Sequence, residues 1–253
     1  MRAKNLRFAS LSSFSSSLSI VHIPITNSNF MSIISYKHKF IYALSPRTAS
    51  TATAAHLVKN MGAEWIPKKH ITDDDGFIIV DKKHSTFEDL VIHNILPEET
   101  VDSFLTFVTV RNPFDSLYSV WYKKRETYVK LIDDPDSWVH KKPGYVEDMY
   151  FIRDHSFSDW IISKFEDLSK DNKSRHLSEK FLKKADRVLK FEELNDELKK
   201  LFDEYNIPYP GEIPVLNKTV GRSDDYRVHY NEEARKVVEK TYDLDLESFG
   251  YSF

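Results

Sequence analysis

The run Phe104–Val110 (FLTFVTV) constrains the fold more than any other stretch of the chain. It is rich in β-branched and aromatic residues and apolar on both faces, which is typical of a strand buried inside a parallel sheet. Parallel strands need long crossover connections, usually helices, and these cover both faces of the sheet. The run therefore predicts an α/β fold with a central, mostly parallel sheet flanked by helices on both faces.

The rest of the chain alternates strand-like and helix-like patterns, as this fold requires. Short apolar runs predict further strands at 40–44, 77–80 and 187–191. Amphipathic spacing predicts helices at 51–61, 114–124, 157–170, 176–184, 193–205 and 231–241. Another helix is expected from Ser85, because Glu88 follows it at the spacing of a capping box. No repeat and no Pro/Gly-rich linker divides residues 31–253, which predicts a single domain.

A polar loop, Ser45–Ser50, lies between the predicted strand at 40–44 and the predicted helix at 51–61. Because the amides at a helix N-terminus attract anions, a strand, a tight polar loop and a helix in this order predict a phosphate cradle. The loop contains no glycine and no Gly-Lys-Ser/Thr sequence, so it is not the P-loop of nucleoside triphosphatases. The sequence thus predicts a P-loop-like domain that binds a different anion.

A second charged segment begins at Arg111, directly after the buried strand, and Ser119 follows about two helical turns later. The planar fork of an arginine and the hydroxyl of a serine can hold a phosphate from two directions. An ordinary helix start with a surface arginine is the alternative. Because ligands bind at the carboxyl ends of the strands in α/β sheets, we expect this segment to meet the Ser45–Ser50 loop at one sheet edge.

The third charged segment, Asp81–His84, follows the predicted strand at 77–80 and belongs to the same expected edge. A neutral imidazole at that edge can remove a proton from a hydroxyl group near neutral pH. The chain has ten histidines, and a surface or structural role is the ordinary function of a histidine. The place of His84 at the expected edge favours the role of a general base.

Composition excludes several classes of protein. The absence of cysteine excludes disulfides, thiolate zinc sites and cysteine nucleophiles. A net charge of −3 argues against a general nucleic-acid-binding protein. No stretch approaches the ~20 apolar residues that a membrane-spanning helix needs. We therefore expect a soluble protein that binds neither nucleic acid nor membrane, located in the cytoplasm or in an organelle.

The organelle alternative depends on residues 1–30, which are serine-rich, basic and free of acidic residues. This composition is typical of a transit peptide. The other interpretation is a mis-assigned start, with Met31 as the initiator. Both interpretations predict a disordered leader outside the folded domain.

Residues 42–57, 110–120 and the tail from Asn217 resemble the sulfotransferase family that uses 3′-phosphoadenosine-5′-phosphosulfate (PAPS), most closely its carbohydrate-type branch. The tail ends on Asp243–Tyr251, which is similar to the end of that family's domain. The resemblance covers nearly all of residues 39–253, with its motifs in the family's order. Each motif is weak alone, and the ordered set makes the resemblance specific.

The resemblance implies roles for individual residues. The family's Pro-Lys/Arg-x-Gly-Ser/Thr-Thr loop holds the 5′-phosphosulfate, and its counterparts here are Pro46, Arg47, Thr48, Ala49, Ser50 and Thr51. The family's arginine and serine that hold the 3′-phosphate correspond to Arg111 and Ser119, and Arg222 is a candidate third contact. The family's Lys-x-His segment, which supplies the acceptor base in several members, corresponds to Lys82 and His84.

These roles imply PAPS as the sulfuryl donor, 3′-phosphoadenosine-5′-phosphate (PAP) as the product, and no metal ion. The loop is expected to hold the phosphosulfate by its backbone amides and by the hydroxyls of Ser50 and Thr51. Arginine cannot hand over a proton at physiological pH, so Arg47 is expected to stabilise the departing phosphate oxygen. Ala49 stands where the family has glycine, and we expect a negative φ there because alanine is penalised at positive φ.

Two other classes of function stay open. One is a P-loop kinase, which the absence of a Lys-Ser/Thr pair and of an evident magnesium carboxylate argues against. The other is a binding module that keeps the nucleotide pocket without catalysis. The acceptor of a sulfotransferase is expected to be a carbohydrate or a small hydroxylated molecule.

Residues 123–158 are expected to form a lid or an acceptor-binding insertion. Aromatic residues there are candidates for stacking on sugar rings, and basic residues for facing an acidic glycan: Trp138, Tyr145 and Tyr150, and Lys123, Lys124, Arg125, Lys141 and Lys142. The alternative is a solvated charged face with the aromatic rings packed inward. Lys82 or Glu88 could assist His84, and Glu88, His70 or His93 could replace it as the base.

Overall fold

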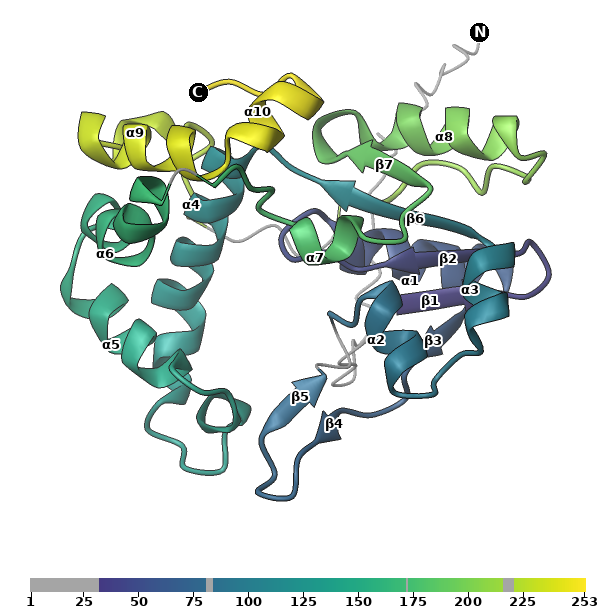
Figure 1. The fold of residues 1–253 in the computed structure, drawn as a ribbon, viewed down its shortest axis with the longest axis horizontal. Coiled ribbons are helices and arrows are strands. Elements are labelled where there is room, and N and C mark those ends of the chain that lie inside the picture. The colour runs from purple at the N-terminus through teal and green to yellow at the C-terminus, as the bar shows by residue number, and fades with distance from the viewer. Residues whose placement is uncertain (1–31, 81–83, 172, 216–220) are drawn as a thin grey trace, which may run out of the picture.

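The computed structural model describes residues 32–80, 84–171, 173–215 and 221–253 (Figure 1). Five strands form one sheet, ordered β3 (Glu64–Ile66), β1 (Ser32–Ser35), β2 (Phe40–Ala43), β6 (Leu105–Val110) and β7 (Arg187–Lys190). Strands β2, β6 and β7 pair in parallel. Strand β1 is antiparallel to both β2 and β3, so β3 points in the same direction as β2. Four of the five strands therefore run the same way, which confirms the mostly parallel central sheet.

Alternating side chains of the sheet enter two separate cores. Phe40, Tyr42 and Phe107 face one side, which is covered by α1 (Ser50–Met61) and α8 (Leu194–Glu204). Ile41 and Val108 face the other side, which is covered by α2 (Phe87–Ile92), α3 (Glu98–Ser103) and α7 (Glu179–Leu182). All six residues of β6 are buried, as its apolar sequence predicts, and the expectation of helices on both faces is confirmed.

Helix α4 (Pro113–Lys123) leaves β6 and leads into a third core made of helices (Figure 1). It packs there with α5 (Tyr145–Asp154), α6 (Phe157–Lys170), α9 (Glu232–Thr241) and α10 (Asp243–Phe249). Buried aromatic rings, among them Phe114, Tyr118 and Trp160, fill this core. No helix in the described ranges has the length and apolar character to cross a bilayer. Helix α4 thus links the sheet edge to the helical side of the molecule.

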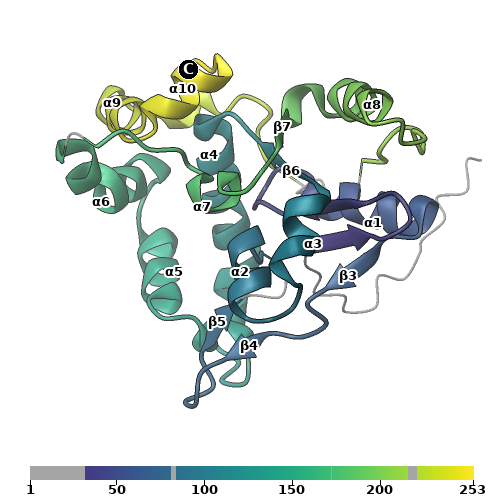
Figure 2. The ribbon, with the colours of Figure 1, turned by 45° about the vertical axis from the view of Figure 1, so that its right-hand side comes forward.

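The strand predicted at 77–80 differs from expectation in its place. Its counterpart β5 (Ile78–Val80) pairs antiparallel with β4 (Ile71–Thr72) in a separate hairpin, which Figure 2 shows below α2, outside the main sheet. The side chain of Val80 is buried, whereas Ile79 is 55% exposed. A run that buries only one of its faces is not an inner strand, and the expectation that this strand ends at the main sheet edge was wrong.

Helix boundaries also differ from the sequence patterns. Helix α2 is capped by Thr86, whose hydroxyl accepts a hydrogen bond from the amide of Asp89, so the capping box lies one residue later than expected. The helix predicted at 176–184 is a single turn, α7. The remaining unpredicted elements are β1, β3, β4, α3, α5 and α10.

Deleting residues 1–30 is expected to leave folding and nucleotide binding unchanged. This segment lies outside the described residues, and all three cores above are built from residues after it. Thermal melting and PAP titration of the truncated protein test this expectation. A large loss of melting temperature on deletion would show that the leader belongs to the fold.

Candidate functional site

The chain leaves β2 through a loop that its own hydroxyl groups hold in place. The hydroxyl of Ser45 donates to the carbonyl of Thr109 on β6. The carbonyl of Ser45 in turn accepts the hydroxyls of Thr48 at 3.0 Å and of Ser50 at 2.7 Å. Thr48 and Ser50 are buried, and their hydroxyl protons are used inside the loop. Ser50 therefore supports the loop in this structure, and its role as a donor to an anion stays a prediction.

Two residues of the loop have left-handed backbone conformations. Arg47 has a φ of 63°, and Ala49, which precedes the first residue of α1, has a φ of 56°. The expectation of a negative φ at Ala49 was wrong. The carbonyl of Ala49 accepts the amides of Ala52 at 2.9 Å and of Thr53 at 3.1 Å. These bonds and those of Ser45 keep the alanine in a conformation that glycine would adopt at lower cost.

The N-terminus of α1 carries no negative charge of its own. Ala49 offers no side chain to cap the helix, and the first turn contains no acidic residue. The first amides of a helix have no partner inside the helix, and the helix dipole makes this end electropositive. The hydroxyl of Thr51 makes no hydrogen bond to any described residue. This end of α1 can therefore accept an anion.

Four of the residues singled out in the sequence meet beside this helix end. Arg47 Nε donates to the hydroxyl of Ser119 at 2.9 Å, and Arg111 Nη1 donates to the carbonyl of Arg47 at 2.7 Å. Arg111 and Arg222 both form ion pairs with the carboxylate of Asp115, Arg111 through Nε at 2.9 Å. The three arginines thus come from the β2–α1 loop, the end of β6 and the segment after residue 220.

The electrostatics of this cluster favour an anionic ligand. Burial lowers the pKa of Arg111 to about 10, and burial together with the charges of Arg111 and Arg47 lowers the pKa of Arg222 to about 10. Burial also lowers the pKa of Arg47. Two of the three guanidinium groups, those of Arg111 and Arg222, share direct contact with a single carboxylate, that of Asp115. Arg222 Nε is buried without a hydrogen-bond partner, and an acceptor from a ligand would remove this cost.

His84 reaches the same loop by a route that the sequence did not predict. Its Nδ1 lies 2.7 Å from the carbonyl of Leu44, the residue after β2. A carbonyl only accepts, so Nδ1 carries the proton and the lone pair of the neutral ring is on Nε2. Nε2 is the nitrogen that can take up a proton. Lys82 lies outside the described residues, and Glu88 is 3.5 Å from Lys183 Nζ.

The sequence did not identify the residues that hold this site together. Asp115 lies at the start of the predicted helix at 114–124, four positions after Arg111, and its opposite charge so close to Arg111 was an available signal. The chain end was not foreseen as a support. The carbonyl of Ser252 accepts Asn112 Nδ2 at 2.8 Å, and Glu192 accepts both the amide of Asn112 and the hydroxyl of Tyr251 at 2.9 Å. The tail thereby fixes the turn that follows Arg111.

The predicted insertion at 123–158 lies next to Arg47, whose pKa the nearby Tyr128 and Tyr145 raise against the larger effect of burial. Its rings pack together, with Trp138 5.3 Å from both Tyr128 and Tyr145. The ammonium group of Lys124 pairs with the buried Asp148. The three rings thus pack on one another, as the alternative interpretation of residues 123–158 expects. A role of the segment as a lid or as an acceptor-binding insertion stays a prediction.

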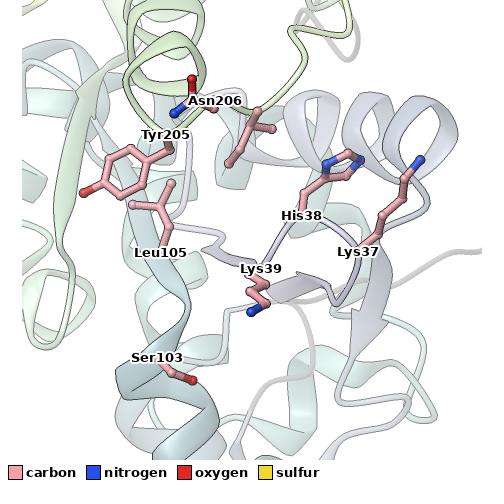
Figure 3. Close-up of a pocket in the computed structure, with 8 residues that line it drawn as sticks. Lys37, His38, Lys39, Ser103, Leu105, Tyr205 and Asn206 are labelled. Atoms are coloured by element: carbon pink, nitrogen blue, oxygen red, sulfur yellow. The ribbon is translucent and has the colours of Figure 1, made fainter.

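A hollow of about 360 Å³ lies at the opposite edge of the sheet and contains none of the predicted site residues (Figure 3). Its walls come from the β1–β2 turn, the start of β6 and the end of α8: Lys37, His38, Lys39, Ser103, Leu105, Tyr205, Asn206 and Ile207. Its walls contain neither an ion-paired arginine nor a helix N-terminus. The candidate site is therefore the arginine cluster at the carboxyl ends of β2 and β6.

Comparison with known proteins identifies the family of the chain. The sequence model of the sulfotransferase family matches residues 31–252, which include every element described above. No curated protein matches the chain, and no solved structure does. The match spans far more than half of the sequence, with the arginine cluster and the β2–α1 loop inside it. The chain belongs to the sulfotransferase family.

Proposed function

We propose that the protein transfers a sulfuryl group from PAPS to a hydroxyl or amine group of an acceptor, most readily a carbohydrate. Family membership supports sulfuryl transfer in general. The observation that carries the finer proposal is the cluster of Arg47, Arg111 and Arg222 beside the uncapped N-terminus of α1. A donor with phosphate groups at two ends suits two adjacent anion sites.

The residues present fit such a donor. Arg111, Ser119 and Arg222 would hold its 3′-phosphate, and the buried Nε of Arg222 is a donor in need of an acceptor. Ser119 accepts Arg47 Nε, while its own hydroxyl proton goes to no described residue. Arg47, Thr51 and the first amides of α1 would hold the 5′-phosphosulfate, with Thr48, Ala49 and Ser50 shaping the loop. The bound donor supplies the activated sulfuryl group.

In the proposed mechanism, His84 Nε2 takes the proton of the acceptor while the acceptor oxygen or nitrogen attacks sulfur in line. A bond from sulfur to the acceptor forms, and the bond from sulfur to the bridging phosphate oxygen breaks with its electron pair on that oxygen. Arg47 stabilises the resulting negative charge. Positioning and electrostatics supply most of the rate in such transfers.

A carbohydrate acceptor is supported by the surroundings of Arg47. Lys123 lies 5.6 Å from the ring of Tyr128, and Lys142 lies 5.1 Å from the ring of Trp138. The ammonium groups of this segment, of which that of Lys123 lies near Arg47, would suit an acceptor with a negative charge, such as an acidic glycan. Tyr150 is 44% exposed and lies under Arg153.

The experiment that tests this function is transfer of labelled sulfate from PAPS. The protein is incubated with labelled PAPS and an extract of the cells that produce it, and mass spectrometry identifies the products. We expect a labelled glycan or hydroxylated small molecule that is absent with heat-treated protein. Release of PAP at the background rate, with no labelled product from any extract fraction, would contradict the proposal.

Arg111→Ala is expected to abolish a preference of the protein for PAP over 5′-AMP. A charge-assisted bidentate contact is worth about 1.5–3 kcal/mol, which corresponds to roughly tenfold or more in affinity. Titration calorimetry with both nucleotides measures the two affinities. Equal affinity of the wild type for PAP and 5′-AMP would refute the assignment of the 3′-phosphate site.

A further inference from the structure

The segment Gly221–Ser223 contacts one face of α4 through Gly221 and Arg222. Gly221 approaches Tyr122 so closely that an added Cβ would lie 2.9 Å from the tyrosine hydroxyl, and its φ is 79°. Arg222 pairs with Asp115, and its guanidinium carbon lies 5.1 Å from the ring centre of Tyr118. The contacts of α4 therefore come from positions 115, 118 and 122, which lie along one helix face.

The hydroxyl of Tyr118 makes a hydrogen bond that fixes the chain after this segment. It lies 2.8 Å from His229 Nε2, and the two rings stack with centroids 4.4 Å apart. Burial and the charge of Arg222 lower the pKa of His229, so the neutral ring accepts the proton of the tyrosine. Tyr118 is 1% exposed, and its position is set by the helical core.

We infer that Tyr118 is a positioning residue that holds Arg222 in the orientation needed to recognise a 3′-phosphate. This inference rests on the proposed function, because it concerns the donor site described above. Arg222 is on a segment without helix or strand, so its backbone needs contacts to stay in place. Tyr118 supplies such contacts from a rigid helix: its ring supports the guanidinium group, and its hydroxyl bonds to His229 further along the same stretch of chain.

Tyr118→Phe tests the inference without a change of charge. Phenylalanine keeps the ring under Arg222 and in the core, and it removes only the hydroxyl with its hydrogen bond to His229. A neutral hydrogen bond contributes about 1 kcal/mol, so we expect PAP affinity to fall roughly fivefold. The affinity for 5′-AMP, which lacks the 3′-phosphate, is expected to stay the same. Titration calorimetry with both nucleotides gives the ratio.

Tyr230→Phe is the matched control. Tyr230 belongs to the same core, and its hydroxyl donates to the carbonyl of Phe114 at 3.0 Å. It contacts no residue of Gly221–Ser223 in the described structure. This variant is expected to lose melting temperature like Tyr118→Phe while keeping the ratio of PAP to 5′-AMP affinity.

A second test separates positioning from stability. In an Arg222→Ala background, Tyr118→Phe is expected to leave the affinity ratio unchanged, because Tyr118 acts through Arg222. If Tyr118→Phe does not fold, Gly221→Ala replaces it as the test, because this variant displaces the exposed end of the same segment. Gly221→Ala is expected to lower the affinity for PAP and not that for 5′-AMP.

The possible outcomes distinguish this inference from the proposed function. A wild type that prefers PAP, with an unchanged preference in Tyr118→Phe and in Gly221→Ala, would overturn the inference and leave the donor site standing. If the ratio of PAP to 5′-AMP affinity fell equally in Tyr118→Phe and Tyr230→Phe, the inference would also be overturned, because the effect would then be one of core stability. A wild type without any preference for PAP would overturn both.

Discussion

Replacing His84 with alanine is expected to lower turnover by about 10²–10⁴-fold and to leave nucleotide affinity nearly unchanged. The carbonyl of Leu44, 2.7 Å from Nδ1, fixes the ring so that Nε2 can receive the acceptor's proton. An imidazole has an ordinary pKa of ~6.5, so a large fraction is neutral at physiological pH. Steady-state rates with the identified acceptor, together with PAP titration, measure both quantities.

His155→Ala is the control for this prediction. Its Nδ1 also contacts a carbonyl, that of Phe151 at 3.0 Å, but it is exposed at the end of α5, and turnover is expected to stay normal. If His84→Ala kept near-normal turnover with the true acceptor, the base would be another group, such as Glu88, His70 or His93. The mechanism proposed here would then be abandoned.

Arg47→Ala is expected to lower turnover by about 10²–10³-fold, the usual loss when one donor to a developing oxyanion is removed, and to weaken nucleotide binding as well. Both effects follow from its place, since Arg47 contacts Ser119 in the donor site and lies beside the N-terminus of α1. Arg47→Lys is expected to keep much of the activity, because an ammonium group still supplies a charged donor.

Single-turnover rates and PAP titration of the two variants check this prediction. The comparison of alanine with lysine separates charge from the shape of the side chain. Normal nucleotide affinity in Arg47→Ala would contradict a contact between Arg47 and the donor. Inactivity of Arg47→Lys with normal binding would show that the planar guanidinium group itself is required.

The central part of the fold was predictable because its signals are strong. The sequence of β6 is apolar on both faces, and such a run has few alternatives to an inner parallel strand. Strand β1 was missed because its four residues, SIIS, carry too short a pattern to distinguish. Strand β5 was misplaced because the short run at 77–80 carries no information about its partner, which tertiary contacts select.

The charged residues of the candidate site could be predicted from the sequence, whereas the backbone conformation and the supporting contacts could not. Arg47, Arg111, Ser119 and Arg222 meet, because the ends of neighbouring parallel strands share an edge. The left-handed conformation of Ala49 was not predictable, since intrinsic preference opposes it and the hydrogen bonds of the loop impose it. The role inferred for Tyr118 depends on a contact 111 residues away along the chain, to His229, and no local pattern reports such a contact.

The most direct test of the central claim, a donor site for PAPS, is a thermal-shift comparison of PAP without metal against ATP with magnesium. A ligand that binds only the folded state raises its melting temperature, and the rise grows with the ratio of ligand concentration to Kd. The arginine cluster and the uncapped end of α1 predict that PAP stabilises the wild type without magnesium and stabilises Arg111→Ala much less. Stabilisation by magnesium and ATP, with no effect of PAP, would contradict the assignment and favour a kinase.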